Sequence, residues 1–280
     1  MTGRSGPPPR IEHIDDPSDP RLADYRDLKD AELRLRHGLF VAESRAVVRR
    51  LLAAGRFRTR SILLTPPALD ALREALEDRG AGAAVYVTRH EIMRAVTGFD
   101  FHRGCLAVGE RGVEPSVESL LDPPGPRMLL VLEDLSNPDN VGGVFRNAMA
   151  FGVDAVLLSA DCADPLYRKT LRVSMGGSLG IPFARLRDWA GGLGRLREAG
   201  YTLVALTPDP TAVDIGELGA PRDAPGRVAL VLGAESHGLG AGTRAAADLE
   251  VRIPMAPGAD SLNVATASGI ALHRFRSQRP

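Results

Sequence analysis

Cysteine is scarce in this 280-residue chain: it contains only Cys105 and Cys162, which lie far apart and form no CxxC pair. We therefore expect neither a disulfide framework nor a structural zinc site, and we interpret both cysteines as small, partly buried residues. No apolar run reaches the roughly 18 residues that a membrane span needs, which excludes that class. Residues 1–20 are polar and rich in Pro and Gly, without the apolar segment of a signal peptide, and they predict a disordered tail on a cytoplasmic protein.

Two common nucleotide-binding motifs are also missing. No GxGxxG occurs anywhere in the chain, which argues against a dinucleotide-binding site. The segment "GAESHGLG" begins like a phosphate-binding P-loop, with four residues between Gly233 and Gly238, but Leu239 stands where that motif has Lys. Neither motif therefore accounts for the glycine-rich loops.

Charge is balanced over the whole chain but is unevenly distributed. Residues 21–111 hold 17 Arg and Lys against 12 Asp and Glu, whereas residues 127–280 hold 16 of each sign. The basic excess peaks in "RAVVRRLLAAGRFRTR". Such a patch is typical of a surface that binds a phosphate backbone, and a solvated helix face is the alternative. The candidate RNA-binding residues are Arg45, Arg49, Arg50, Arg56, Arg58 and Arg60.

The hydrophobic pattern predicts two α/β domains joined by a linker. In residues 21–111, strand-like runs alternate with amphipathic helices, which indicates a small α/β sandwich. Residues 112–126 contain four prolines and three acidic residues but no basic one, a composition typical of a linker. In residues 127–280, five apolar runs predict a parallel sheet buried on both faces. Its expected strands are 128–134, 154–159, 201–207, 227–233 and 249–255, and its expected helices are 142–151, 165–175, 189–199, 241–247 and one from about 262.

The loop after the first of these strands carries a candidate site. Ligands of open α/β sheets bind at the carboxyl ends of the strands, and "PDNVGGVFRNA" follows such an end. Asn140 is a candidate helix cap, and Gly142 and Gly143 allow another surface to approach the backbone. Arg146 lies within about two turns of Asn140, so both side chains can reach one crevice. An ordinary capped helix with a surface arginine is the alternative.

Two further loops follow strands of the same domain. In "LVLGAESHGLG", Glu235 comes directly after the strand end, and His237 is a candidate base, although such a histidine is more often only solvated. In "IPMAPGADSLNVATASGIALH", Ser261 and Asn263 introduce a helix of small residues, and simple capping by Ser261 is the alternative to a functional role.

Taken together and in this order, the three loops resemble the SpoU (TrmH-like) family of RNA 2′-O-ribose methyltransferases. The pattern is N-x-G-x-x-x-R-[N/S/T]-A, then G-x-E-x-x-G, then I-P-M followed by S-L-N at the last helix. With "DPLYRKTLRVSMGGSLGIPF", the resemblance covers essentially all of residues 127–280. The matching residues are Asn140, Gly142, Arg146, Asn147, Ala148, Gly233, Glu235, Gly238, Ile253, Pro254, Met255, Ser261, Leu262 and Asn263.

The resemblance implies a fold and a cofactor. The loops after the strands 201–207, 227–233 and 249–255 would form a deep trefoil knot, which nothing in the periodicity itself indicates. S-adenosylmethionine would bind in that knot, largely through backbone groups. The implied cofactor contacts are Leu206, Thr207, Gly233, Ile253, Met255 and Leu262. The basic first domain looks like the substrate-binding domain of ribosomal-protein L30e type that many family members carry.

The chemistry that the resemblance implies requires no metal. A 2′-hydroxyl becomes a nucleophile when its proton is lost or shared, so the enzyme must align the reacting atoms and relieve charge on the oxygen. In related enzymes the arginine at the position of Arg146 has been viewed as a general base, which is the alternative here. Because guanidinium keeps its proton to a pH above about 12, we interpret Arg146 instead as a stabiliser of the alkoxide that also grips the adjacent phosphate. Asn140 would orient Arg146, and Glu235 would hold the arginine or the loop. Ser261 and Asn263 would complete the catalytic pocket.

The resemblance also bears on substrate and partners. The Asn140–Arg146 and Ser261–Asn263 pairs favour ribose over base methylation, and an unstacked RNA loop is the natural target of an enzyme that recognises a 2′-hydroxyl. The basic first domain favours ribosomal RNA, with 23S RNA as the expectation, over transfer RNA. A non-catalytic RNA-binding homologue is the third possibility, which a failure to bind cofactor would support. The family further implies a homodimer through the knotted domain, for which the small-residue last helix suits close packing.

Overall fold

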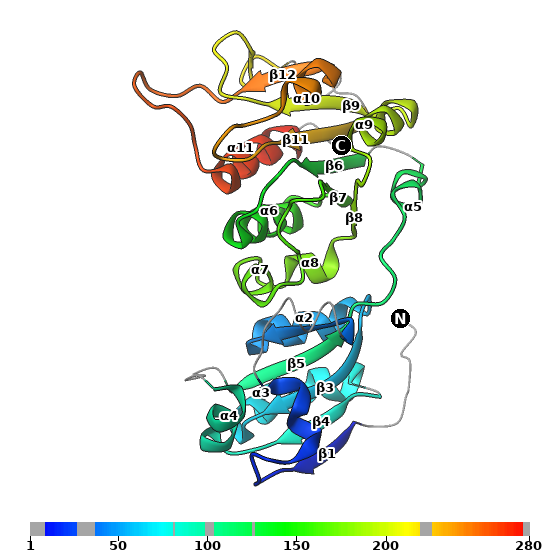
Figure 1. Cartoon of the computed structure of the whole chain (residues 1–280), viewed down its shortest axis with the longest axis vertical. Helices are drawn as coiled ribbons and strands as arrows, with labels where there is room; N and C mark the ends of the chain where they lie inside the picture. Colours follow the sequence, from blue (N-terminus) through cyan, green and yellow to red (C-terminus); the bar gives the residue numbers. More distant parts are fainter. Residues whose placement is uncertain are drawn as a thin grey trace. The chain divides into compact units, whose positions relative to one another are not determined.

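The chain divides into two compact units in this computed structural model (Figure 1). The first unit comprises Met1–Val113 with Leu166–Gly180, and the second comprises Glu114–Pro165 with Ile181–Pro280. The structure describes residues 9–26, 37–80, 82–98, 104–124, 127–218 and 226–276. Residues 1–8 of the predicted tail and 125–126 of the predicted linker lie outside these ranges.

The first unit is built on a mixed five-stranded sheet in the order β1-β4-β3-β5-β2. β1 and β3 run parallel to β4, whereas β5 is antiparallel to both β3 and β2. The predicted alternation of strands and helices is confirmed. The elements are β1 (Arg10–His13), the 3-10 helix η1 (Pro20–Tyr25), β2 (Leu39–Glu43), α2 (Arg45–Ala54), β3 (Arg58–Leu64), α3 (Pro66–Arg79), β4 (Ala84–Val87), α4 (His90–Thr97), β5 (Cys105–Glu110), α7 (Arg168–Val173) and α8 (Gly177–Gly180).

The prediction of a disordered tail up to residue 20 is wrong from residue 10 onward. β1 pairs with β4 in register, with Ile11 opposite Val85. Ile14 and the η1 residues Leu22 and Tyr25 are buried in the core of this unit. Short apolar signals in a Pro-rich, polar segment do not predict a strand, because the pairing partner lies more than 70 residues away in the sequence.

The second unit contains a seven-stranded sheet in the order β10-β12-β9-β11-β6-β7-β8, with every neighbouring pair parallel. The predicted buried parallel sheet is confirmed, and the edge strands β8 and β10 add to the five that were expected. The elements are α5 (Val117–Leu121), β6 (Arg127–Leu132), α6 (Pro138–Ala150), β7 (Ala155–Leu158), β8 (Phe183–Arg185), α9 (Trp189–Glu198), β9 (Thr202–Leu206), β10 (Val213–Asp214), β11 (Arg227–Leu232), α10 (Ala241–Ala246), β12 (Leu249–Arg252) and α11 (Val264–Arg276).

Two segments differ from the expected division of the chain. The predicted linker contains α5, whose Leu120 and Leu121 are buried in the core of the second unit. The segment Leu166–Gly180 was expected in the second domain but belongs to the first unit, where α7 packs against β2 and α8 against α2. Composition does not reveal such assignments, because they depend on which apolar face a short helix finds.

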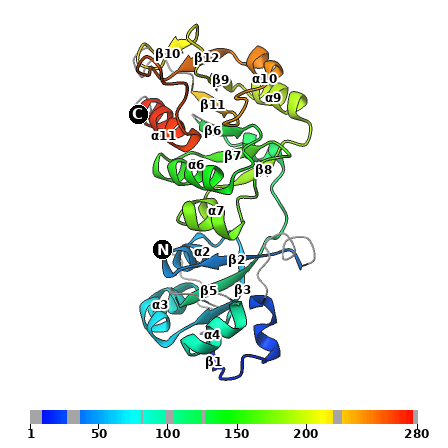
Figure 2. The same ribbon diagram turned by 60° about the vertical axis from the view of Figure 1, so that its left-hand side comes forward.

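Helices cover both faces of the parallel sheet. Figure 2 shows α6 and α11 on one face and α9 and α10 on the other. Strand residues such as Leu129 and Val131 pack with Leu193 and Leu196 of α9, and the residues between them in the strands are buried against the opposite face. None of the helices in the described ranges has both the length and the apolar character of a membrane span.

α6 and α11 pack at very short range. A Cβ built on Gly143 of α6 would lie 2.5 Å from the Cβ of Ala265 in α11. The side chain of Asn147 donates hydrogen bonds to the Ala265 carbonyl, at 2.6 Å, and to the hydroxyl of Ser268, at 2.9 Å. The loops that precede the two helices are thereby brought together, although they lie more than 100 residues apart in the sequence.

Candidate active site

A cavity of about 590 Å³ lies at the carboxyl ends of β9, β11 and β12, within the range of roughly 300–1,000 Å³ that small-molecule sites occupy. Its walls are the segments that follow these three strands, together with the start of α11. It is lined by Leu206, Thr207, Pro208, Asp209, Pro210, Leu232, Gly233, Ala234, Glu235, Ser236, His237, Gly238, Leu239, Arg244, Ile253, Met255, Asp260, Ser261, Leu262, Val264 and Ala267.

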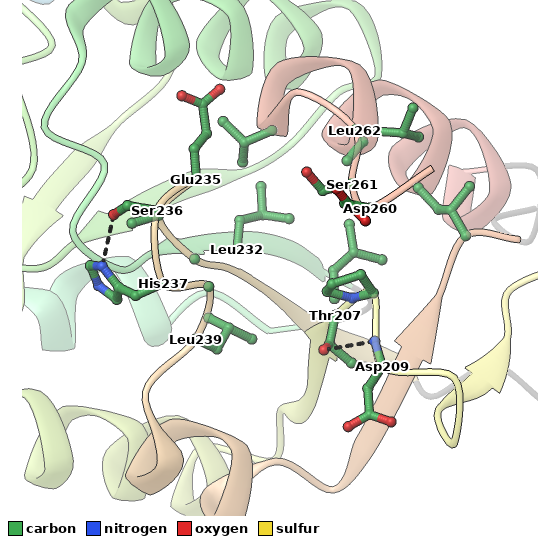
Figure 3. A pocket seen from close by; sticks show the side chains of 18 of the residues that line it. Thr207, Asp209, Leu232, Glu235, Ser236, His237, Leu239, Asp260, Ser261 and Leu262 are labelled. Carbon is green, nitrogen blue, oxygen red and sulfur yellow. Dashed lines mark hydrogen bonds between the residues drawn. The ribbon is translucent and has the colours of Figure 1, made fainter. Parts of the chain in front are cut away.

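The residues that were expected to contact the cofactor all line this cavity. They are Leu206, Thr207, Gly233, Ile253, Met255 and Leu262. Of the predicted catalytic residues, Glu235 and Ser261 also line it. Figure 3 shows Ser261 and Leu262 across the cavity from the loop that carries Glu235, Ser236 and His237.

The loop after β11 is a closed turn. The Gly238 amide donates to the Ala234 carbonyl at 2.9 Å, and Gly238 has a φ of +68°. A Cβ on Gly233 would lie 2.4 Å from the carbonyl of Gly238, so this position needs glycine for close backbone packing. The Gly240 amide donates to the carboxylate of Glu133 at 3.1 Å. Glu133 therefore holds the end of this loop next to the carboxyl end of β6.

Three predicted catalytic residues form one hydrogen-bonded group. The side-chain amide of Asn263 donates to Oδ1 of Asn140 at 3.0 Å and to Oε1 of Glu235 at 2.7 Å. The Asn263 Oδ1 accepts from the amides of Ala265 and Thr266, at 3.0 and 3.3 Å. Asn263 therefore caps α11 and at the same time connects the loops after β6 and β11.

The local roles expected at the start of α6 are corrected by the structure. Asn137, not Asn140, is the N-cap, and its side chain accepts from the Asp139 amide at 2.9 Å, with Pro138 in the first turn. Asn140 lies inside the first turn and is 7% exposed. Likewise Asn263, not Ser261, caps α11. In both loops a second polar residue competes for the cap, and the sequence alone does not decide between them.

The surface that approaches the backbone at Gly143 is another helix and not a ligand, because the neighbour of Gly143 is Ala265 of α11. The glycine therefore permits close packing of two helices, and this packing carries Asn263 to Asn140.

Arg146 lies on the exposed side of α6. Within the described part of the chain it has neither a hydrogen-bond nor an ion-pair partner, and Asn140 and Glu235 instead bond to Asn263. The predicted orientation of Arg146 by Asn140 is thus not a contact in this structure. The guanidinium is available to an anion from outside.

His237 lies at the rim of the cavity in a polar cluster. Its Nδ1 is 2.9 Å from the hydroxyl of Ser236, and its Nε2 is 3.9 Å from Oδ2 of Asp134. Asp134 has a φ of 56°, in the left-handed region, and its Oδ1 accepts from the hydroxyl of Ser159 at 2.7 Å. The histidine is 58% exposed, so its surroundings are largely water.

A charged group that the sequence did not predict also lines the cavity. Arg244 of α10 donates to Oδ2 of Asp209 at 2.7 Å and to both carboxylate oxygens of Glu250, at 2.7 and 2.6 Å. Hydrogen bonds from the side chain and the amide of Thr211, followed by that from Arg244, lower the pKa of Asp209 to about 2. Hydrogen bonding to Arg244 lowers the pKa of Glu250 as well. No motif marks these residues, because their partners lie in three different segments.

The predicted RNA-binding arginines differ in the contacts they make within the first unit; Arg56, for example, donates to the Ser178 carbonyl at 3.4 Å. On β3, Arg58 pairs with Glu110 at 3.1 Å and Arg60 with Asp24 at 3.2 Å. On α2, the guanidinium of Arg49 donates to the Ala71 carbonyl at 2.8 Å. The remaining residues are Arg45, which is exposed at the start of α2, Arg50 within the same helix, and Arg56, whose guanidinium stacks over the ring of Phe57.

The site as a whole joins three features. It has a small-molecule cavity at the carboxyl edge of a parallel sheet, a hydrogen-bonded Asn140–Asn263–Glu235 group beside it, and an exposed cation on α6. Among the residues lining the cavity, three are carboxylates, Asp209, Glu235 and Asp260, and one is a guanidinium, Arg244. This balance of charge suits a small ligand that carries positive charge.

Comparison with known proteins shows which family the chain resembles in this region. Residues 127–273 match the SpoU rRNA Methylase family. The chain is 42% identical over 272 residues to an uncharacterized tRNA/rRNA methyltransferase of Mycobacterium tuberculosis, covering 95% of this chain and 92% of the relative. It is 33% identical over 201 residues to the 23S rRNA (guanosine-2′-O-)-methyltransferase RlmB of Ralstonia nicotianae, covering 71% of this chain and 79% of the relative.

A solved structure of an rRNA methyltransferase is also similar to this chain. The rRNA methyltransferase of Sinorhizobium meliloti with bound AdoMet superposes with a TM-score of 0.77 at 26% identity, covering 95% of this chain and 97% of that one. The family match covers more than half of the chain and includes the loops that wall the cavity. The chain therefore belongs to the SpoU family and is an S-adenosylmethionine-dependent RNA 2′-O-methyltransferase.

Proposed function

We propose that the substrate of this enzyme is 23S ribosomal RNA. The relative named as a 23S rRNA (guanosine-2′-O-)-methyltransferase supports this assignment, as does the excess of basic residues in the sequence of the first unit. Arg45 is an exposed cation of α2 that has no hydrogen-bond or ion-pair partner in the described residues, whereas the exposed Arg49 donates to the Ala71 carbonyl, so Arg45 is the first candidate for a phosphate contact.

The cavity beside β9, β11 and β12 is the proposed cofactor site. Apolar side chains such as Leu206, Leu232 and Ile253 suit the adenine ring, and the excess of carboxylates suits a ligand with a sulfonium and an ammonium group. When bound, S-adenosylmethionine supplies a methyl group that is already strongly electrophilic. The trefoil knot that the family resemblance implies stays a prediction for the segments that follow these strands.

The residues around the cavity have proposed roles in aligning the ribose. Arg146 stabilises charge on the 2′-oxygen and holds the adjacent phosphate, because a permanently protonated guanidinium can do both. Asn263 holds Glu235 and Asn140 in place through its side-chain amide. Glu235 and Ser261 lie at the boundary between the cavity and the proposed position of the ribose.

The active form is proposed to be a homodimer that pairs through the second unit. Ala265, Ser268 and Gly269 contact α6 of the same chain, so these small residues are not available to a partner. The outer side of α11 instead presents Ile270, a large apolar residue that is 40% exposed. A monomer in sedimentation at micromolar concentration contradicts the proposed dimer.

Methyl transfer from labelled S-adenosylmethionine to total RNA from cells lacking the gene tests the substrate. We expect the label on the ribose of 23S RNA, and label in transfer RNA or on a base overturns the proposal. Gly233→Ala is the matched control, because its Cβ must displace the Gly238 backbone and deform the cofactor cavity. This variant should lose both labelling and the calorimetric signal of cofactor binding.

A further inference from the structure

The segment after β9 forms one wall of the proposed cofactor cavity. Thr207, Pro208, Asp209 and Pro210 all line that cavity. Within the segment, Oδ1 of Asp209 accepts from the amide and the hydroxyl of Thr211, at 2.9 and 2.7 Å. The Asp209 amide donates to the hydroxyl of Thr207 at 3.3 Å. These bonds set the shape of the wall, but none of them attaches it to the rest of the unit.

The start of the wall is attached by the Thr207 amide, which donates to the Val251 carbonyl of β12 at 2.9 Å, and β10 after it pairs with β12. Between these two points the wall is attached by Arg244. Its Nη2 donates to Oδ2 of Asp209 at 2.7 Å, while its Nε and Nη2 donate to Oε1 and Oε2 of Glu250, at 2.7 and 2.6 Å. Arg244 lies on α10, the helix that follows the Gly233–Gly240 loop, and Glu250 lies on β12, the strand that ends directly before Ile253. One guanidinium therefore connects three chain regions around the cavity, and the start of α11 forms the remaining wall.

The geometry of this group is suited to positioning. A planar guanidinium that binds one carboxylate with two nitrogens and a second carboxylate with another bond has a defined orientation, which lysine cannot reproduce. All three side chains are partly exposed, at 36, 25 and 26%, so solvent screens the contribution of the ion pairs to folding stability. The ion pairs instead hold the Thr207–Thr211 wall in one conformation.

We propose that Arg244 is a positioning residue for the cofactor, which keeps the Thr207–Thr211 wall in the conformation that binds S-adenosylmethionine. This inference rests on the proposed assignment of the cavity as the cofactor site. Without Arg244 the part of the wall between Thr207 and β10, which includes Asp209, is free to leave that conformation. If a tenth of the molecules retain it, the apparent Kd rises about tenfold, because binding is reduced by the fraction of competent molecules.

A double-mutant cycle measured by calorimetry with S-adenosylmethionine tests the inference. Arg244→Ala and Asp209→Ala should each raise the Kd about tenfold, and the double variant should be no weaker than about tenfold, since both changes release the same wall. Arg244→Lys should fall between wild type and Arg244→Ala. The control is Arg197→Ala, which breaks a comparable pair with Asp248 at 2.9 Å that does not line the cavity. Its Kd should stay within about twofold of wild type.

The outcomes separate this inference from the assignment of the cavity. A Kd about a hundredfold weaker in the double variant shows independent contacts with the ligand and overturns the positioning role. An equal loss in Arg197→Ala overturns it as well, because the effect is then one of general stability. If Gly233→Ala abolishes binding while Arg244→Ala does not change it, only this inference fails. If neither variant changes the Kd, the cofactor binds elsewhere and both proposals fail.

Discussion

Replacing Arg146 with alanine should lower the rate of methyl transfer about a thousandfold, the upper range for losing one charge-stabilising donor. The guanidinium is exposed on α6 and has no partner among the described residues, so its charge is available to the substrate. Because Arg146 does not line the cofactor cavity, the Kd for S-adenosylmethionine should not change. Single-turnover methylation and calorimetry on the same preparation measure the two quantities.

Two further variants make this result specific. Arg146→Lys keeps the charge but loses the planar fork, so it should recover only part of the rate if the arginine holds both the 2′-oxygen and a phosphate. Arg187→Ala removes another exposed arginine of the same unit, after the edge strand β8, and should methylate normally. Full activity in Arg146→Ala would contradict the proposed role.

Replacing Asn263 with aspartate should lower the rate about a hundredfold, the scale of a misplacement of about 1 Å at a reacting centre. The side-chain amide that donates to Asn140 and Glu235 is lost, and a carboxylate is placed where Glu235 Oε1 now accepts at 2.7 Å. Two adjacent carboxylates repel and raise the pKa of one of them, so Glu235 should move away. The oxygen that caps α11 is retained, and the helix should be unaffected.

Replacing Asn263 with serine separates its role as a helix cap from its proposed catalytic role. Asn263→Ser keeps a good helix cap but is too short to reach Asn140 and Glu235 together, so it should also lose the rate while unfolding at the wild-type temperature. Asn263→Ala should in addition lose about 1 kcal/mol of unfolding free energy with the cap. Normal methylation by both the aspartate and the serine variants would show that the Asn140–Asn263–Glu235 group is structural only.

The local sequence pattern correctly predicts the helices and strands whose own residues define them. The strands of the parallel sheet are apolar runs long enough to be seen alone, and α2 carries its apolar stripe and its terminal Gly55 in consecutive turns. Prediction failed for elements that depend on a distant partner. β1 needs β4, and α5 needs an apolar surface on the second unit, so their own sequences contain too little signal.

The same distinction applies to the site. The family motifs identified the residues around the cavity, because each motif is a short segment that the chain carries at the end of one strand. The motifs did not predict which polar residues cap the helices, nor that Gly143 accommodates Ala265 and not a ligand. They also contained no sign of Arg244, since its importance arises from two carboxylates that other segments bring to it.

The alternating α/β order, the parallel sheet, the family and the residues at the strand ends could thus be predicted from the sequence, since short contiguous segments carry all of them. Three features became visible in the fold alone: Asn263 joins Asn140 to Glu235, Leu166–Gly180 belongs to the first unit, and Arg244 connects three regions around the cavity. The difference comes from the short range of the interactions. Hydrogen bonds and ion pairs act over a few ångströms, so residues of different segments, such as Asn140 and Asn263 or Arg244 and Asp209, acquire a shared role only when the fold brings them into contact.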